Sequence, residues 1–216
     1  MRSIWSLIST ILLLILATGT SQERELNWEN MLFSSLKLQK NIDYEKNADC
    51  YLQQFRKTLW NKYRNDEFEL EARRKESITQ LKNRIAAFDL NDEFVTYTDF
   101  NIGKYNFKKQ SFPVSGLTQT TYFYQTVYAG CGDFARQYKV FFNNTNMIGD
   151  LNMPKEKAKQ FIKYRKDSRG KISRKIYAKL YFKIVSLKGS PDNLMAKLTR
   201  VTLYDNHKRQ RVLKEF

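Results

Sequence analysis

Residues that build metal centres and catalytic triads are scarce in this sequence. Its 216 residues include one histidine, His207, and two cysteines, Cys50 and Cys131. A structural zinc site takes about four ligands at short spacings, so a centre made of His and Cys is nearly excluded. The chain also has no G-x-S-x-G turn, no phosphate loop and no dinucleotide fingerprint. We therefore expect a protein that is not an enzyme and that holds no cofactor and no metal.

Glycine and proline are also rare, with 8 and 3 residues. Flexible linkers and low-complexity segments are rich in these residues, so the sequence predicts no sharp boundary between domains. Because 42% of the residues are hydrophobic and 14% are aromatic, the chain has enough apolar side chains for a folded core. We expect a single domain over residues 22–216, with a helical portion at 22–90 and a basic, β-rich portion at 91–216.

The sequence lacks a hydrophobic run of the roughly 20 residues that a membrane-spanning helix needs. A shorter apolar stretch at residues 7–16 follows the basic Arg2 and precedes the small residues Ala17, Thr18 and Gly19. This order is typical of a secretory signal peptide. The sequence therefore predicts a signal peptide at about residues 1–21 and an exported protein, periplasmic or secreted. The alternative is an uncleaved N-terminal anchor.

Acidic residues are scarce in one half of the chain. Residues 22–95 contain 13 basic and 14 acidic residues, whereas residues 96–216 contain 24 basic and 8 acidic residues. The C-terminal half therefore carries a net charge of +16, equal to that of the whole chain. Such an excess favours an anionic partner, which the charge does not identify further: an anionic polymer, a membrane surface or a nucleic acid.

The two cysteines have two competing interpretations. Export to an oxidising compartment favours a disulfide bond between Cys50 and Cys131. The alternative is a hydrolase or transferase in which Cys131, which lies between two glycines, is the nucleophile, His207 is the base and Asp133 lies nearby. A disulfide bond would consume the thiol, so the two interpretations exclude each other.

The N-terminal half has a helical pattern. Apolar residues recur every three or four positions between residues 52 and 88: Leu52, Phe55, Leu59, Tyr63, Ile78, Leu81, Ile85 and Phe88. This spacing predicts one long amphipathic helix over about residues 50–87, bent near Asn65 and Asp66 where the apolar stripe thins. The stripe has few clean heptads, which favours a helix packed on a sheet over a coiled-coil arm.

From residue 93 onward the hydrophobic period changes to two. Aromatic and β-branched runs predict strands at 94–98, 105–107, 120–128 and 136–142, the last two joined as a hairpin through a turn at 129–133. Pro154 marks the start of a short basic helix at about 154–166. Strands at 173–185, 195–204 and 209–213 then predict a C-terminal β-meander. Helices followed by strands, without β-α alternation, indicate an α+β fold with a mostly antiparallel sheet.

The strand at residues 173–185 alternates most strictly. Its even-numbered positions, from Ile176 to Ile184, are apolar and predict a buried face. The opposite face, with one lysine from the next strand, forms the predicted ligand-binding surface, the Lys/Tyr face: Lys175, Tyr177, Lys179, Tyr181, Lys183 and Lys197. Rings beside cationic stems are used by proteins that bind single-stranded nucleic acid. The alternative is a solvated face whose tyrosines favour the strand and whose lysines prevent edge pairing.

Together these patterns predict an exported, non-enzymatic binding or envelope-associated protein that presents the Lys/Tyr face to an anionic ligand. A secreted nucleic-acid-binding or host-directed protein is the second hypothesis. An enzyme that uses Cys131 is the third.

Overall fold

The computed structural model describes residues 23–216. The predicted signal peptide at residues 1–21 lies outside the described residues. No helix within residues 23–216 combines the length and the apolar character that a membrane crossing requires. The described helices are α1 (Trp28–Leu38), α2 (Tyr44–Phe55), α3 (Lys57–Tyr63), α4 (Glu67–Ala87) and α5 (Lys155–Lys163), with a 3-10 turn, η1 (Thr145–Met147).

The strands form one large sheet and one small one. The large sheet has the order β1-β2-β8-β9-β6-β5, with β10 paired to β9 and β4 paired to β2, and the small sheet pairs β3 with β7. Most neighbours are antiparallel, which confirms the predicted α+β class; β1 with β2 and β6 with β9 are parallel. The strands are β1 (Glu23–Glu25), β2 (Glu93–Ile102), β3 (Ser111–Phe112), β4 (Val114–Ser115), β5 (Tyr122–Thr126), β6 (Gln137–Phe142), β7 (Leu151–Asn152), β8 (Lys175–Lys188), β9 (Ser190–Tyr204) and β10 (Val212–Glu215).

Strand β8 lies at the centre of the large sheet, between β2 and β9. The alternation predicted for residues 173–185 is confirmed, because Ile176, Ala178, Leu180, Phe182 and Ile184 are all buried. Strands β8, β9 and β10 are antiparallel in chain order, so the C-terminal meander is confirmed as well. The apolar face of these strands forms the main core with α1, whose Met31, Leu32 and Leu36 are fully buried.

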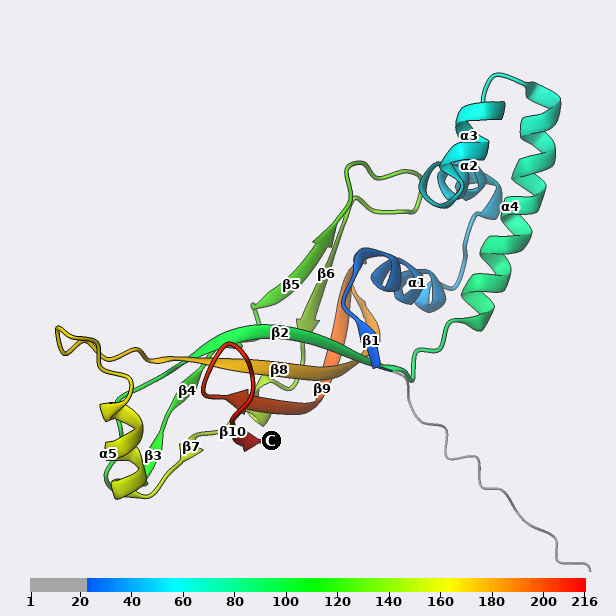
Figure 1. The fold of residues 1–216 in the computed structure, drawn as a ribbon. Coiled ribbons are helices and arrows are strands. Elements are labelled where there is room, and N and C mark those ends of the chain that lie inside the picture. The colour runs from blue at the N-terminus through cyan, green and yellow to red at the C-terminus, as the bar shows by residue number, and fades with distance from the viewer. Residues whose placement is uncertain (1–22) are drawn as a thin grey trace, which may run out of the picture.

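Two details of the predicted long helix differ from the structure. Residues 44–87 form three helices, with breaks at Arg56 and at residues 64–66. The second break is the predicted bend, where the Asp66 carboxylate accepts a hydrogen bond from the Glu69 amide (3.1 Å) and caps α4. The long helix α4 packs on α2 rather than on the sheet, and α1 is the helix that packs on the large sheet (Figure 1).

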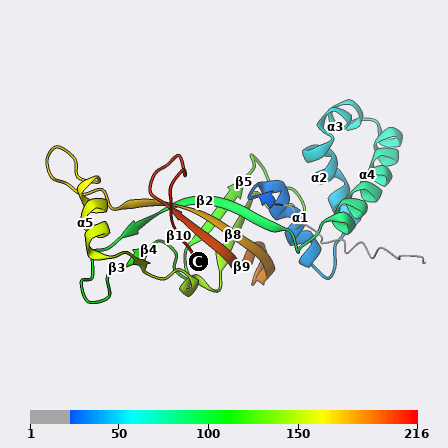
Figure 2. The same ribbon diagram turned by 60° about the horizontal axis from the view of Figure 1, so that its bottom comes forward.

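The molecule is elongated because its helical and basic ends lie apart. Helices α2, α3 and α4 occupy one end, and α5 with β3 and β7 occupies the other, with the large sheet between them (Figures 1 and 2). The N-terminal half with balanced charge and the strongly basic segment around α5 are therefore separated in space as well as in sequence.

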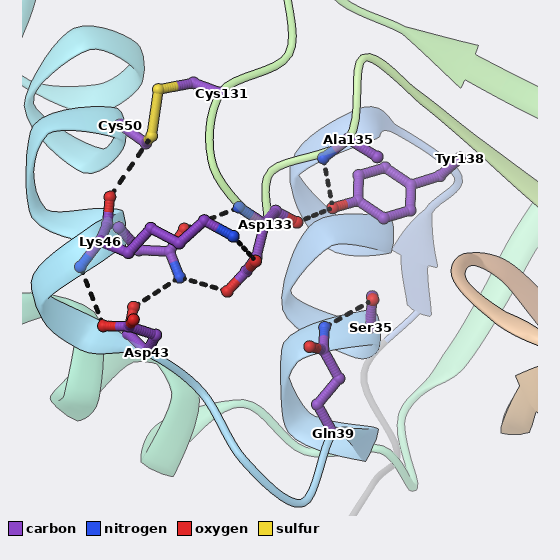
Figure 3. Close-up of polar contacts among 10 residues, drawn as sticks. Ser35, Gln39, Asp43, Lys46, Cys50, Cys131, Asp133, Ala135 and Tyr138 are labelled. Carbon is purple, nitrogen blue, oxygen red and sulfur yellow. Dashed lines mark hydrogen bonds and ion pairs between the residues drawn. A yellow bond between two sulfur atoms is a disulfide. The ribbon is translucent and has the colours of Figure 1, made fainter.

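A disulfide bond and a polar cluster join the helical end to the sheet. The predicted bond forms: Cys50 of α2 is bonded to Cys131 in the turn between β5 and β6, with 5.4 Å between their Cα atoms (Figure 3). Beside it, the Asp133 amide donates to Asn47 Oδ1 (2.9 Å), and Asn47 Nδ2 donates to the Asp133 carboxylate (2.7 Å). Lys46 Nζ donates to the same carboxylate (2.8 Å).

This junction requires a glycine at position 132. Gly132 has a φ of +58°, and a Cβ atom there would lie 2.6 Å from Asn47 Oδ1 and 2.9 Å from Cys50 Sγ. Both the left-handed backbone and the close approach of α2 exclude a side chain. Gly132 thus serves the approach of α2 to this turn, whereas a Cβ atom at Gly130 would meet the backbone of the same turn at Arg136.

The charge at this junction predicts an acid-dependent stability. The hydrogen bond from Lys46 is the main cause that lowers the pKa of Asp133 below its ordinary 3.8, and the Asn47 side chain adds to it. A carboxylate whose pKa is lower in the folded than in the unfolded protein stabilises the fold at pH values above its unfolded-state pKa. This contribution is lost as the pH falls through the folded-state pKa. We expect Asp133→Asn to destabilise the protein at neutral pH and to differ less from wild type between about pH 4 and pH 2.

Urea unfolding at several pH values checks this expectation. The matched control is Glu156→Gln, an exposed carboxylate on α5, which should change stability little at any pH. A loss for Asp133→Asn that stays constant down to the lowest pH would contradict the role assigned to the Asp133 carboxylate.

Candidate functional site

The register of the sheet brings the predicted Lys/Tyr face together on one side. Tyr177, Lys179 and Tyr181 alternate along β8, and their neighbours on β9 are Tyr204, Thr202 and Arg200. Lys183 lies directly opposite Lys197, so the expectation that Lys197 joins this face from the neighbouring strand is correct. The six residues nevertheless differ in how much of each side chain a ligand can reach.

Much of the positive charge on this face is balanced by carboxylates from neighbouring strands. Lys175 pairs with Asp99 of β2 (2.9 Å), and Lys179 pairs with Glu23 of β1 (3.2 Å). The hydrogen bond and charge of Asp99 raise the pKa of Lys175. For Lys179, burial lowers the pKa, but hydrogen bonds to Tyr181 and Glu23 outweigh it and the net shift is upward. Both amines therefore stay charged and bound within the protein.

The tyrosine at the middle of the face is covered. Tyr181 is buried, with the Arg200 guanidinium 3.7 Å and the Lys179 amine 4.4 Å from its ring centre. A base cannot stack on a ring that is already covered by cations of the protein. Within the described residues, Lys183 and Lys197 are the lysines of this face without a carboxylate partner within 4.0 Å.

A pocket of about 440 Å³ lies where the face meets the segment after α5. Lys175 and Tyr177 line it together with His207 and several basic side chains. Its most buried cation, Arg165, is bound to the Asp205 carboxylate (2.5 Å) and to the backbone oxygen of Lys175 (2.6 Å). Because Asp205 and Asp167 also line this pocket, its charge is largely compensated within the protein.

A second concavity has a different character. This groove, of about 620 Å³, lies between α5 and the segment 105–112, and it shares Lys166 with the first pocket. No carboxylate is among its lining residues, which are Tyr105, Phe107, Phe112, Lys155, Ala158, Lys159, Ile162, Lys163, Lys166 and Arg174. The groove thus combines five cationic side chains with an apolar and aromatic lining.

Three lysines of the groove come from one side of α5, and a fourth follows the helix. Lys155, Lys159 and Lys163 are spaced by four residues, which places them on one side of α5, and Lys166 lies three residues beyond the end of the helix. These four residues are called the lysine stripe of α5. All four are exposed, and in the described part of the chain none has a carboxylate within 4.0 Å. A neighbouring stripe of α5 is buried, where Phe161 packs on Phe112 with 5.7 Å between ring centres.

The opposite wall of the groove is a tight turn that presents Phe107. The Asn106 carboxamide accepts hydrogen bonds from the amides of Lys108 and Lys109, both at 3.0 Å. The backbones of Asn106 and Ser111 bond to each other across the turn (2.8 and 3.3 Å). Phe107 is 72% exposed, although its ring contacts Tyr105 edge-on at 5.1 Å.

The catalytic alternative is not assembled in the structure. The Cys131 sulfur is bonded to Cys50, so it offers no thiol to a substrate. Asp133 is engaged by Lys46 and Asn47 at the helical end. His207 lines the first pocket with Lys175 and Tyr177, among residues remote from the disulfide. The predicted nucleophile and base therefore lie in different parts of the molecule.

Sequence reasoning did not identify the groove, because its walls come from segments about 45 residues apart. Two signals pointed toward it. The helix expected at 154–166 was basic and amphipathic, and most of the excess charge follows residue 154. Neither signal indicates that the turn at 106–110 lies beside α5, which depends on pairing between β3 and β7.

Comparison with known proteins gives one match. Residues 43–164, from the N-terminal end of α2 to the residue after α5, match the model of a family described as a domain of unknown function (DUF4852). No curated protein and no solved structure matches the chain. The matched segment contains both ends of the molecule, including the turn at 106–110 and Lys155, Lys159 and Lys163 of α5, whereas Lys166 lies just beyond it.

Proposed function

The chain belongs to the DUF4852 family, whose description names no activity, and from its surface we propose that it is an exported, non-enzymatic binding protein for an anionic ligand. The binding site in this proposal is the groove between α5 and residues 105–112. In this proposal the Lys/Tyr face contributes through Lys183 and Lys197, which form a separate, smaller cationic site.

The observation that carries the proposal is the uncompensated charge of the groove. Five cationic side chains surround an apolar lining that contains no carboxylate, whereas Lys175 and Lys179 of the Lys/Tyr face are each paired with an acid. Clustered like charges in a concave surface raise the local concentration of counter-ions and speed the association of oppositely charged ligands. The groove is therefore better suited to an anion than the part of the Lys/Tyr face around Lys175 and Lys179.

The disulfide bond supports export. Disulfide bonds form and persist in oxidising compartments and are rare in the cytosol of mesophilic cells. The bond between Cys50 and Cys131 fits a protein that folds after crossing a membrane, periplasmic or secreted, and the signal-peptide pattern at residues 1–21 gives the route. Mass spectrometry of the protein recovered from the producing cells tests whether the predicted signal peptide has been cleaved.

A nucleic acid is the competing ligand. Sheet-face binders stack bases on exposed rings, and the central ring of the Lys/Tyr face, Tyr181, is buried. The geometry thus favours an anionic polymer or headgroup layer that contacts the α5 end, without a stacked base.

Binding to heparin as a model polyanion tests the proposal. We expect the full chain to bind a heparin column and to elute at a salt concentration that falls clearly in a variant with Lys155, Lys159, Lys163 and Lys166 changed to Gln. The control changes four exposed lysines of the helical portion, Lys40, Lys57, Lys62 and Lys82, to Gln, with the same loss of charge. Electrostatic binding weakens as salt rises, so equal shifts in both variants, or elution at low salt by wild type, would refute a specific anion site on α5.

A further inference from the structure

The basic tip of the molecule, residues 104–110 and 155–174, combines charge with exposed aromatic rings. These two segments contain twelve basic and two acidic residues. Within them Phe107 is 72% and Tyr164 is 82% exposed. A dissolved polyanion accounts for the charge, but it gives no reason for a phenylalanine ring that faces water. A partner with both a negative surface and an apolar interior accounts for both features.

The exposed ring is held by a fixed turn. Residues 106–111 close on themselves through Asn106, and the Gln110 carbonyl accepts a hydrogen bond from the Met153 amide (2.9 Å) just before α5. The Tyr105 hydroxyl donates to the Met153 carbonyl (2.8 Å), and the Ser111 hydroxyl donates to Asp150 (2.9 Å). Since the turn is already ordered, little conformational entropy is lost when its ring enters a partner.

Basic residues lie next to Phe107 in the chain and along the groove that it lines. Lys108 and Lys109 follow Phe107 in the same turn, and the lysine stripe of α5 borders the same groove. Basic side chains near an anionic bilayer surface each add roughly 1 kcal/mol to binding. Aromatic side chains enter the boundary between headgroups and acyl chains, and charge combined with buried apolar area sets the strength of interfacial binding.

We propose that the basic tip docks on the surface of an anionic phospholipid bilayer. Phe107 enters the acyl region, and Lys108, Lys109 and the lysine stripe of α5 bind headgroup phosphates. This inference rests on the proposed anion-binding function and names its ligand. Because the tip and helices α2, α3 and α4 lie at opposite ends (Figure 2), an end-on orientation leaves the helical portion directed away from the lipid.

Co-sedimentation with vesicles separates the contributions of charge and ring. The full chain is mixed with vesicles of phosphatidylglycerol and phosphatidylcholine in equal parts, and with pure phosphatidylcholine vesicles. We expect Phe107→Ser to weaken binding to the anionic vesicles at least about tenfold, because burial of a phenylalanine side chain contributes about 1.5–3 kcal/mol. Its control, Phe68→Ser, removes a ring that is 88% exposed on α4 and should leave binding unchanged.

The variant with Lys155, Lys159, Lys163 and Lys166 changed to Gln tests the electrostatic contribution to binding. It should weaken binding to anionic vesicles at least about a hundredfold at low salt, since each lysine contributes roughly fivefold. A Phe107→Trp variant reports insertion directly: its emission should shift to shorter wavelength with anionic vesicles and be quenched by brominated acyl chains.

The outcomes distinguish this inference from the proposed function. Heparin binding without binding to anionic vesicles overturns the bilayer inference and leaves the anion site intact. Vesicle binding that Phe107→Ser does not change, or equal binding to pure phosphatidylcholine, also overturns it, because the ring or the charge then plays no part. If the protein binds neither heparin nor anionic vesicles, both proposals are overturned. The expected pattern is loss for Phe107→Ser on vesicles alone and loss for the lysine variant on both probes.

Discussion

The double variant Cys50→Ser, Cys131→Ser should lose about 4 kcal/mol of unfolding free energy, because the bond restricts the unfolded chain across a sequence separation of 81 residues. The chain-entropy model makes this loss large when the closed loop is long. The bond also ties α2 to the turn between β5 and β6, where Asn47 and Asp133 complete the junction. Loss of the bond should therefore loosen the helical end first.

Urea unfolding with and without a reducing agent measures this effect. Reduction should lower the stability of wild type to that of the double variant and leave the double variant unchanged. Hydrogen exchange should accelerate in α2 more than in β8, which lies at the centre of the sheet. A stability loss below about 1 kcal/mol would mean that the Asn47–Asp133 contacts alone hold the junction.

The second large effect is expected at Phe182, in the centre of β8. Its side chain is fully buried, with the rings of Phe94 and Phe142 at 5.6 and 5.2 Å between centres. Phe182→Ala removes contacts on both sides and leaves a cavity in the core. We expect it to lower the free energy of unfolding by about 3–5 kcal/mol.

The same change on the surface provides the control. Phe107→Ala truncates a phenylalanine that is 72% exposed and should cost less than about 1 kcal/mol. Urea unfolding of both variants gives the comparison, and it also shows that substitutions at Phe107 test binding in a folded protein. Similar losses at the two positions would mean that the turn at 106–110 contributes to the core, against its exposure.

The local sequence pattern predicted much of the large sheet correctly. Strict alternation along residues 173–185 predicts a half-buried strand, and β8 has its apolar residues in the core as expected. The pairing of β8 with β9 follows from the tight turn at Gly189. The pairs β5–β6 and β9–β10 are joined by longer loops, and their pairing agrees with the tendency of consecutive strands to be neighbours. Parallel pairing of β6 with β9 had no such local signal.

The helical half was determined less completely. Apolar spacing predicted helix through residues 50–87 and a bend near Asp66, which caps α4. The pattern cannot say which neighbour covers an apolar stripe, and the sheet is covered by the short helix α1, while α4 packs on α2. The disulfide partners followed from composition, but their proximity depends on how α2 meets the turn at 129–133.

Composition and periodicity by themselves determined the α+β class, the buried face of β8 and the concentration of positive charge in the C-terminal half. The tertiary structure decided which of these positive charges have no carboxylate partner. Strands β1 and β2 place Glu23 and Asp99 beside Lys179 and Lys175, so two of the four lysines of the Lys/Tyr face are paired with acids distant in sequence. The lysines of α5 instead meet an aromatic turn without carboxylates. The physical reason is that charge is a property of each residue, whereas its compensation depends on which strands the fold makes neighbours.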